Sequence, residues 1–512
     1  MNNSNRTKNS VRNVATGLIV KFIVILMPFI IRTIIIKKLG MEYLGLGSLF
    51  TSIIQVLSLS DLGFSIAISF YLYKPIQNGE KDTVCYLLNY LKKIYYIVGT
   101  VILCAGLGVM PFLPHLIYGT YPADINLYVL YLIFLSNTVL SYFFFSYRRV
   151  LLNASQRSDI ENVITLIVSL ATYTLQIVFL LLFSNYYLYA IFMPLSTLAV
   201  NIVGLFACKK IFPDYVPSGN IPKEQKTDIN HHIKAMVGHK IAHVVVNSTD
   251  SIFISAFLGL TVLAIYQNYF YIVSSLLAVV AIIYSSISAS IGNYIAFESK
   301  ENNLKLFNRL TFFNVLMIGW MSICLFVLYQ PFMKIWVGEE NMMPFLTVCL
   351  LVLHFYSWKF KEILSVFKDS AGMWTLDFWK PYVITALNII LDVVLVIFVG
   401  VDGVIIATII SVSFVSLPWE TAVFYKRYFQ VGPKNFYLRL LLLTILVLVA
   451  GGLTYLACYF IPDEGIGYFI LKAGICLLLP NLIFLLVSFK RDEFKWLVNK
   501  SKPTIRKLLR KQ

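Results

Sequence analysis

The feature that most constrains this chain is that almost no part of it stays polar for long enough to fold as a soluble domain. The longest polar interruption runs from Lys209 to Lys240, with apolar segments on both sides. Hydrophobic residues make up 59% of the chain, whereas soluble globular domains have roughly 45–50%. A membrane-spanning helix needs about 20 apolar residues, so the sequence predicts an all-α polytopic membrane protein. The apolar runs are continuous rather than alternating, which argues against a membrane β-barrel.

We expect about 14 transmembrane helices, because the chain contains that many apolar segments separated by short polar or turn-forming stretches. The segments cover residues 13–37, 43–70, 84–109, 125–147, 160–183, 188–208, 240–258, 263–291, 309–329, 343–364, 376–399, 402–424, 437–459 and 467–489.

The Lys and Arg residues gather on one side of this arrangement. If the N-terminus is cytosolic, 35 of the 42 lie in cytosolic segments, three in outer connections and four within spans. Membrane proteins keep Lys and Arg on the cytosolic side, so we expect both termini in the cytosol of a multi-pass cell (plasma or inner) membrane protein. The net charge of +17 then follows from topology and predicts no nucleic-acid partner. The cytosolic set includes Arg148, Arg149, Arg157, Lys359, Lys361 and Lys368.

A weak repeat at an offset near 219 residues links the two halves of the chain. Leu39-Gly40 is matched by Leu258-Gly259, and Pro111-Phe112 by Pro331-Phe332. Six spans therefore repeat as six spans in parallel orientation, which predicts two pseudo-symmetric lobes around a central cavity, plus two extra C-terminal helices. The expected parts are an N-lobe (1–208), a cytosolic linker (209–239), a C-lobe (240–425), spans thirteen and fourteen (426–489) and a basic tail (490–512).

Span one carries two basic residues inside its apolar run, Lys21 and Arg32. Their spacing of eleven residues puts them on about the same helix face, roughly 16 Å apart along the axis. An ionisable group inside the bilayer is costly and usually faces a cavity or a partner. We expect both to line a cavity for an anionic substrate, because a guanidinium matches a phosphate in bidentate fashion. The alternative is structural: Lys21 snorkels to the interface and Arg32 pairs with an acid.

Acidic residues inside the spans are candidate coupling-ion sites. Asp61 lies in span two and Asp250 in span seven. Arg32 precedes Gly40 by eight residues and Asp250 precedes Gly259 by nine, so the repeat puts the two charges at similar depth. We hypothesise that Arg32 and Asp250 both edge the cavity and pair in one conformational state. Asp61 is equally a candidate for a structural ion pair with span one.

Polar residues lie close to Asp250 in the sequence and at the start of the following span. Asn247 lies three residues before Asp250, and Gln267 and Asn268 lie just inside the outer start of span eight. A polar run within a span suggests a cavity wall. We therefore assign Asn247, Gln267 and Asn268 to the substrate cavity, where their amides can bond sugar hydroxyls.

Other charged residues in the later spans favour structural roles. Lys380 and Glu420 fall near the cytosolic ends of spans eleven and twelve, and we expect them to form an ion pair. Asp392 and Lys472 lie deeper, and the sequence assigns them no role.

No motif indicates a catalytic residue, a metal site or a cofactor. His239 and His243 have the spacing of a zinc-protease helix, but Lys240 stands where the catalytic Glu is required. The chain has no Walker A sequence and no GxSxG elbow. We expect no enzyme activity and no cofactor, with proton or sodium coupling left open.

Three segments carry a resemblance to a known family. They are PFIIRTIIIKKLGMEYLGLGSLFTSIIQVLSLSDLGF from Pro28 to Phe64, YLYKPIQNGE from Tyr71 to Glu80, and NSTDSIFISAFLGLTVLAIYQNYFYI from Asn247 to Ile272. The chain resembles the bacterial polysaccharide and oligosaccharide flippases of the multidrug/oligosaccharidyl-lipid/polysaccharide exporter superfamily. The resemblance implies translocation of undecaprenyl-diphosphate-linked oligosaccharide units to the outer leaflet by alternating access, for capsule, O-antigen or exopolysaccharide assembly. The implied partners are this lipid-linked glycan, the lipid bilayer and the polysaccharide-assembly machinery.

Alternatives remain within the superfamily and outside it. A lipid II flippase shares the basic cavity. A cation-coupled multidrug exporter shares the fold, but span one has no acidic residue between Gly17 and Ile36. A membrane enzyme, either a polysaccharide polymerase or an O-acyltransferase, is the alternative of another class. His354 in span ten is the lone candidate for a catalytic His, and a structural role is the favoured interpretation.

Overall fold

The computed structural model describes residues 3–58, 64–222, 226–227, 229, 244–246, 248–496 and 499. These residues are overwhelmingly helical and include no β-strand, so the all-α prediction is confirmed. Helices satisfy their own backbone hydrogen bonds, which a chain inside a bilayer requires. The chain divides into two compact units, Met1–Gln267 and Asn268–Gln512, called here the N-unit and the C-unit.

The N-unit is a bundle of helices followed by a short apolar helix, Val244–Leu258. Its bundle consists of α1 (Asn3–Lys38), α2 (Met41–Leu57), α3 (Phe64–Asn78), α4 (Lys81–Val109), the 3-10 helix η2 (Met110–Leu116), α5 (Leu127–Phe143), α6 (Ser146–Ala154), α7 (Ser158–Phe183) and α8 (Tyr186–Ile211).

The C-unit begins within α10 (Leu260–Phe297). Its further helices are α11 (Lys300–Val337), η3 (Glu339–Asn341), α12 (Phe345–Lys359), α13 (Glu362–Ser370), η4 (Met373–Asp377), α14 (Lys380–Val399), α15 (Val401–Ile410), η5 (Ser411–Ser416), α16 (Leu417–Phe424), η6 (Tyr425–Phe429), α17 (Lys434–Tyr459) and α18 (Ile466–Ser488).

A polytopic membrane protein is confirmed, but the count of fourteen spans is not. Ten helices among the described residues are long and apolar enough to cross a membrane, or eleven if α5 and α6, bent by 56°, form one span. Within the described residues, the helices that overlap the predicted spans 43–70 and 240–258, and the main helix of the predicted span 343–364, have 15 to 17 residues. Such helices rise about 23–26 Å, less than the roughly 30 Å of the hydrocarbon core.

The glycines of the predicted repeat end helices at matching places. Gly40 follows α1 with φ 117°, and Gly259 precedes α10 with φ 92°. Each donates its N–H to the carbonyl five residues earlier, that of Ile35 and that of Ile254. A positive φ is accessible to glycine at little cost, which explains why this residue stands at both turns. The two halves of the chain thus repeat this local geometry.

The first part of the predicted linker packs along α4. Asp214 forms an ion pair with Lys81 at 2.7 Å, and the carbonyl of Gly219 accepts a hydrogen bond of 2.6 Å from Asn89. The described linker residues therefore belong to the N-unit, as do Val244–Leu258 and the start of α10. The predicted lobe boundaries stay a prediction. The two compact units meet inside α10, whereas the predicted lobes meet in the linker.

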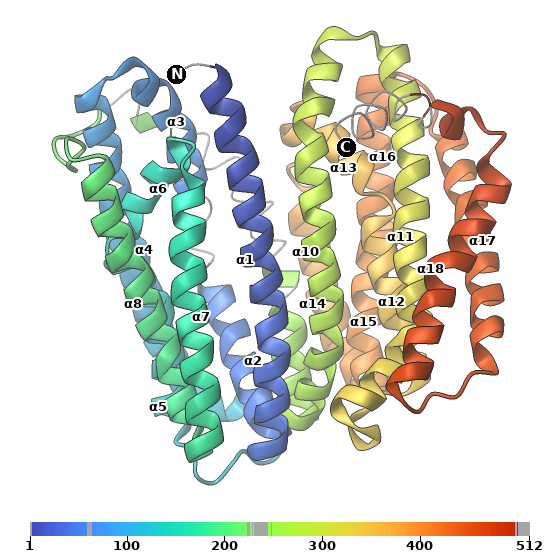
Figure 1. The fold of residues 1–512 in the computed structure, drawn as a ribbon, viewed down its shortest axis with the longest axis horizontal. Helices are drawn as coiled ribbons and strands as arrows, with labels where there is room; N and C mark the ends of the chain where they lie inside the picture. Colours follow the sequence, from blue (N-terminus) through green and yellow to red (C-terminus); the bar gives the residue numbers. More distant parts are fainter. Residues whose placement is uncertain are drawn as a thin grey trace, which may run out of the picture. The chain divides into compact units, whose positions relative to one another are not determined.

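Inside the N-unit, α1 packs along α7 and α7 packs along α8 (Figure 1). Asn162 of α7 donates to the hydroxyl of Thr16 on α1 at 3.1 Å. Phe50 of α2 fills the interior, with its ring 5.4 Å from Tyr131 and 5.7 Å from Phe134 of α5. Polar and aromatic contacts thus hold α1 and α2 against the rest of the bundle.

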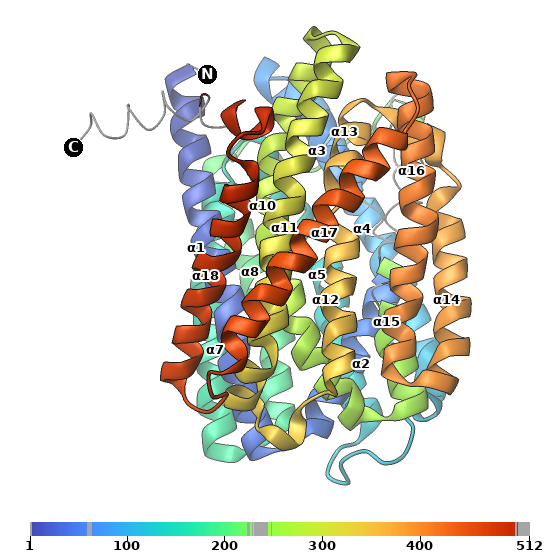
Figure 2. The ribbon, with the colours of Figure 1, turned by 90° about the vertical axis from the view of Figure 1, so that its right-hand side faces the viewer.

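In the C-unit, α17 and α18, drawn in red, lie against α11 (Figure 2). Gly319 of α11 permits the close approach, because a methyl group there would overlap Val447 of α17. The indole of Trp320 donates to the carbonyl of Cys476 on α18 at 3.0 Å. The two extra C-terminal helices are therefore packed parts of the C-unit.

Candidate functional site

The helix predicted as span one, α1, carries both cations that the sequence assigns to the substrate cavity. Pro28 lies inside α1 without ending it. Lys21 is exposed, whereas Arg32 is half-buried. The charge of Arg32 acts on the buried hydroxyls of Tyr186 and Tyr189, at the start of α8. Arg32 is thus within electrostatic range of two buried tyrosines of the N-unit, whereas Lys21 lies on the surface of α1.

Asp250 and Gln267 belong to one polar cluster of the N-unit. Asp250 is buried and accepts a hydrogen bond from the Tyr266 hydroxyl. Gln267 donates through Nε2 to Oγ of Ser251 at 2.7 Å. Oδ1 of Asp250 is buried and has no hydrogen-bond partner among the described residues. An unsatisfied carboxylate oxygen within an apolar helix is costly, which makes Asp250 a candidate for holding a proton or a cation.

Only one of the three remaining predicted cavity residues lies among the described residues. In the described part of the chain, no ion pair joins Arg32 to Asp250, and their pairing in another conformational state stays a prediction. Asn268 is fully buried at the start of the C-unit. Asp61 and Asn247 lie outside the described residues.

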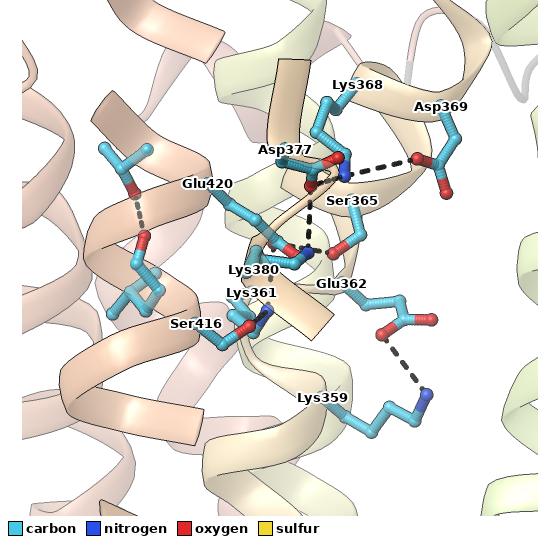
Figure 3. A network of polar contacts seen from close by, with 12 residues as sticks. Lys359, Lys361, Glu362, Ser365, Lys368, Asp369, Asp377, Lys380, Ser416 and Glu420 are labelled. Atoms are coloured by element: carbon cyan, nitrogen blue, oxygen red, sulfur yellow. Dashed lines mark hydrogen bonds and ion pairs between the residues drawn. The ribbon is translucent and has the colours of Figure 1, made fainter. Parts of the chain in front are cut away.

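The predicted ion pair between Lys380 and Glu420 is confirmed, and it is part of a larger buried network (Figure 3). Lys361 donates to the other carboxylate oxygen of Glu420 at 2.9 Å and to the Ser416 hydroxyl at 2.8 Å. Ser365 donates to the same Glu420 oxygen at 2.9 Å. Glu420 therefore neutralises two lysines, one just before α13 and one at the start of α14.

Asp377 extends the network toward α13. It forms ion pairs with Lys368 and, at 3.0 Å, with Lys380. Lys361, Lys368, Lys380, Asp377 and Glu420 are all at most 8% exposed as side chains. Sequence reasoning missed Lys361 and Lys368 because it counted them as cytosolic loop charges. Their burial follows from α13 and η4, which fold the connection between α12 and α14 back against α16.

Two deeper charges of the C-unit now have defined surroundings. Asp392 on α14 is fully buried, one turn after the buried Asn388, which donates to the Thr408 hydroxyl of α15 at 3.2 Å. Lys472 of α18 forms an ion pair with Asp463. Lys472 is thus a structural cation, whereas a buried carboxylate in an apolar helix makes Asp392 a functional candidate.

A pocket of about 630 Å³ opens in the N-unit where α1 meets α2. Glu42, Tyr43 and Asp124 line it together with Leu39–Met41, Pro122, Ala123 and Thr261. The Tyr43 hydroxyl donates to Asp124. No basic side chain lines this pocket, and none of the predicted cavity residues does, so it does not suit an anionic substrate.

Comparison with protein families shows to which family the chain belongs. Residues 10–291, more than half of the sequence, match the family described as polysaccharide biosynthesis protein. The chain belongs to this family. No protein of curated function matches it in sequence.

Solved structures share the fold of this polysaccharide biosynthesis protein. A lipid II flippase, MurJ, in an inward closed conformation matches with a TM-score of 0.65 at 15% identity, over 94% of this chain and 99% of that one. An inward-facing multidrug resistance transporter of the MATE family matches at 0.57 and 16% identity, over 78% and 96%. A mutant of the Vibrio cholerae MATE transporter VcmN matches at 0.56 and 15% identity, over 84% and 100%. The chain therefore shares its fold with these membrane transporters.

The lone candidate for a catalytic residue of a membrane enzyme, His354, has no catalytic surroundings. It is buried on α12, and its ring lies 5.2 Å from Trp358 and 6.0 Å from Phe270. Its Nδ1 has no hydrogen-bond partner among the described residues, whereas a catalytic base needs an orienting group. No group of three His, Cys, Asp or Glu side chains in the described ranges could hold a metal ion.

Proposed function

We propose that this polysaccharide biosynthesis protein is a flippase that moves undecaprenyl-diphosphate-linked oligosaccharide units from the inner to the outer leaflet. The observation that carries the proposal is family membership over residues 10–291, in a chain that shares a transporter fold over 94% of its length. MurJ, which shares this fold, is a flippase for a lipid, lipid II. Alternating access between two lobes is the mechanism that we propose, with the lipid tail in the bilayer and the headgroup in the central cavity.

Arg32 is the residue that we propose to bind the diphosphate. It is half-buried in an apolar helix, and its charge acts on the buried Tyr186 and Tyr189. A guanidinium presents a planar fork of donors that fits phosphate better than an ammonium does. The same charge opposes cationic drugs, which argues against a multidrug exporter.

The test is a deletion in the native host. We expect lipid-linked units to accumulate on the cytosolic face while surface polysaccharide disappears. Wild type and Lys21→Ala should restore the surface polymer, and Arg32→Ala should not, since Lys21 is exposed and Arg32 is not. Normal surface polysaccharide with new sensitivity to cationic drugs would refute the proposal. Loss of peptidoglycan precursors at the surface would instead identify a lipid II flippase.

We propose that transport is coupled to a cation at Asp250, with Asp61 and Asp392 as the alternative sites. The buried Oδ1 of Asp250 supports this assignment, because a proton or a sodium ion would satisfy it. Asp250→Asn should abolish the dependence of transport on the sodium or proton gradient, while Asp392→Asn retains it. If Asp392→Asn loses the gradient dependence and Asp250→Asn keeps it, the coupling site is Asp392. Thermal unfolding of both variants shows whether either change acts through loss of folding.

We also propose that both termini face the cytosol, as the distribution of Lys and Arg supports. Reporter fusions at residues 1 and 512 should then be active only as cytosolic reporters. In this orientation the flippase would deliver its substrate to the polysaccharide-assembly machinery on the outer face.

A further inference from the structure

Arg148 stands out among the buried basic residues of the chain. Lys361, Lys368, Lys380 and Lys472 are each buried and each forms an ion pair with a carboxylate. Arg148 is 9% exposed, and no described carboxylate forms an ion pair with it. A buried charge is normally paired, because desolvation without compensation is expensive. Arg148 is thus a buried cation whose counter-charge is missing from the described chain.

The neighbours of Arg148 are already matched to one another. Arg149, the next residue of α6, forms an ion pair of 2.5 Å with Glu161 and donates to the Asn201 side chain at 3.2 Å. Arg157 pairs with Asp159 at 3.2 Å. Among the described residues, Glu161 and Asp159 thus pair with the neighbouring arginines and neither pairs with Arg148.

Local structure presents Arg148 as an anion ligand. It is the third residue of α6, which lies between α3, α7 and α8. The main-chain carbonyl of Arg148 accepts a hydrogen bond from the Cys208 thiol of α8, which fixes the backbone in place. The guanidinium Nε is sealed from solvent without a partner, whereas the terminal nitrogens are not sealed. A small anion can thus reach the outer edge of the guanidinium while its stem stays buried.

The N-terminus of α6 adds to this positive potential. No side chain caps it, and the preceding residue, Phe145, takes a left-handed conformation with φ 60°. Helix side chains tilt toward the helix N-terminus, so Arg148 leans toward the N–H groups of Ser146 and Tyr147. The N–H of Arg148 itself donates to the Phe145 carbonyl at 3.0 Å. A helix N-terminus and a guanidinium both favour phosphate oxygens.

We infer that Arg148 and the N-terminus of α6 form a binding site for a phosphoryl group, separate from the proposed transport residues of α1. α6 lies in a connection that we place on the cytosolic side, so its ligand is either the phosphate of an inner-leaflet lipid headgroup or a water-soluble phosphate. This inference does not depend on the proposed substrate, because it rests on the missing counter-charge of Arg148 and on the uncapped N-terminus of α6.

The experiment uses the full-length protein in an uncharged maltoside detergent that contains no phosphate. Because the site proposed at Arg32 also binds a diphosphate, every protein in this test carries Arg32→Gln, including the reference that is called wild type below. Inorganic pyrophosphate should raise the melting temperature of this reference in a dose-dependent way. Arg148→Met should abolish this stabilisation and leave the ligand-free melting temperature unchanged or higher, because an uncompensated buried charge has been removed. Arg148→Lys should bind pyrophosphate at least about tenfold more weakly than wild type. It keeps the positive charge but loses the planar guanidinium that donates two hydrogen bonds at once. The matched control is Lys210→Met, an exposed basic residue at the end of α8.

A second arm identifies the source of the phosphoryl group. If pyrophosphate has no effect but added phosphatidylglycerol stabilises wild type and not Arg148→Met, the ligand is a lipid headgroup. The inference is overturned if Arg148→Met fails to fold or melts well below wild type without ligand, because Arg148 is then structural. It is equally overturned if Arg148→Met responds to both additives as wild type does, or if neither additive stabilises wild type.

Discussion

Glu420 offers the sharpest test of how the buried network stabilises the C-unit. Its carboxylate is 4% exposed and accepts from Lys361, Lys380 and Ser365. Glu420→Gln leaves Lys361 without a carboxylate, whereas Lys380 keeps Asp377 at 3.0 Å. Breaking a buried ion pair by removing one partner costs about 3–5 kcal/mol. For a unit of this size, we expect the melting temperature to fall by about 6–20 °C.

The matched variants decide whether charge is the cause. Lys361→Met together with Glu420→Gln removes one cation and one anion, so most of the loss should be recovered, because Lys361 no longer stands as a buried charge without a carboxylate. Glu301→Gln, which breaks the exposed pair with Lys305 on α11, should leave the melting temperature unchanged. The assay is thermal unfolding of the purified protein followed by circular dichroism. A melting temperature of Glu420→Gln equal to wild type, or a double variant worse than the single one, would refute the reasoning.

Three further predictions follow from packing. Gly319→Leu should lower the melting temperature because it collides with Val447, while Gly452→Leu, which meets open space, should not; equal effects would contradict the close packing of α11 and α17. Gly259→Ala should cost more stability than Gly40→Ala: both strain a positive φ by about 1–3 kcal/mol, but only the former meets a carbonyl, that of Tyr118, at 2.9 Å. His354→Phe should retain transport, measured as surface polysaccharide, and loss of the polymer in a stably folded variant would revive the enzyme interpretation.

The sequence predicted the class of fold because apolar length alone demands helices in a bilayer. It predicted the Lys380–Glu420 pair because both residues fall near the same ends of neighbouring spans. It could not predict that Lys361 and Lys368 are buried. A charged residue in the segment between two spans gives the same sequence pattern whether that segment lies in water or packs against the helices. The same limit hid Arg148, which was counted as a cytosolic charge although α6 buries it.

The number of spans was the weaker prediction, for a related reason. Hydropathy does not reveal where a helix breaks, and the predicted span over 43–70 holds two helices, α2 and α3, rather than one. Polar candidates in the predicted cavity were brought together only in part: Gln267 bonds Ser251 beside Asp250, whereas Lys21 is exposed. Side-chain direction on a helix depends on packing, which spacing along the sequence does not specify.

The central claim is that this polysaccharide biosynthesis protein moves a lipid-linked diphosphate glycan across the membrane, and reconstitution tests it most directly. Proteoliposomes would carry undecaprenyl-diphosphate-linked oligosaccharide, and a membrane-impermeant reagent would score the headgroups that reach the outer leaflet. We predict that wild type makes the inner-leaflet pool accessible, that Arg32→Lys does so more slowly, and that Arg32→Gln behaves like protein-free liposomes. Wild-type liposomes indistinguishable from protein-free ones, while the same preparation transports a cationic dye, would contradict the claim.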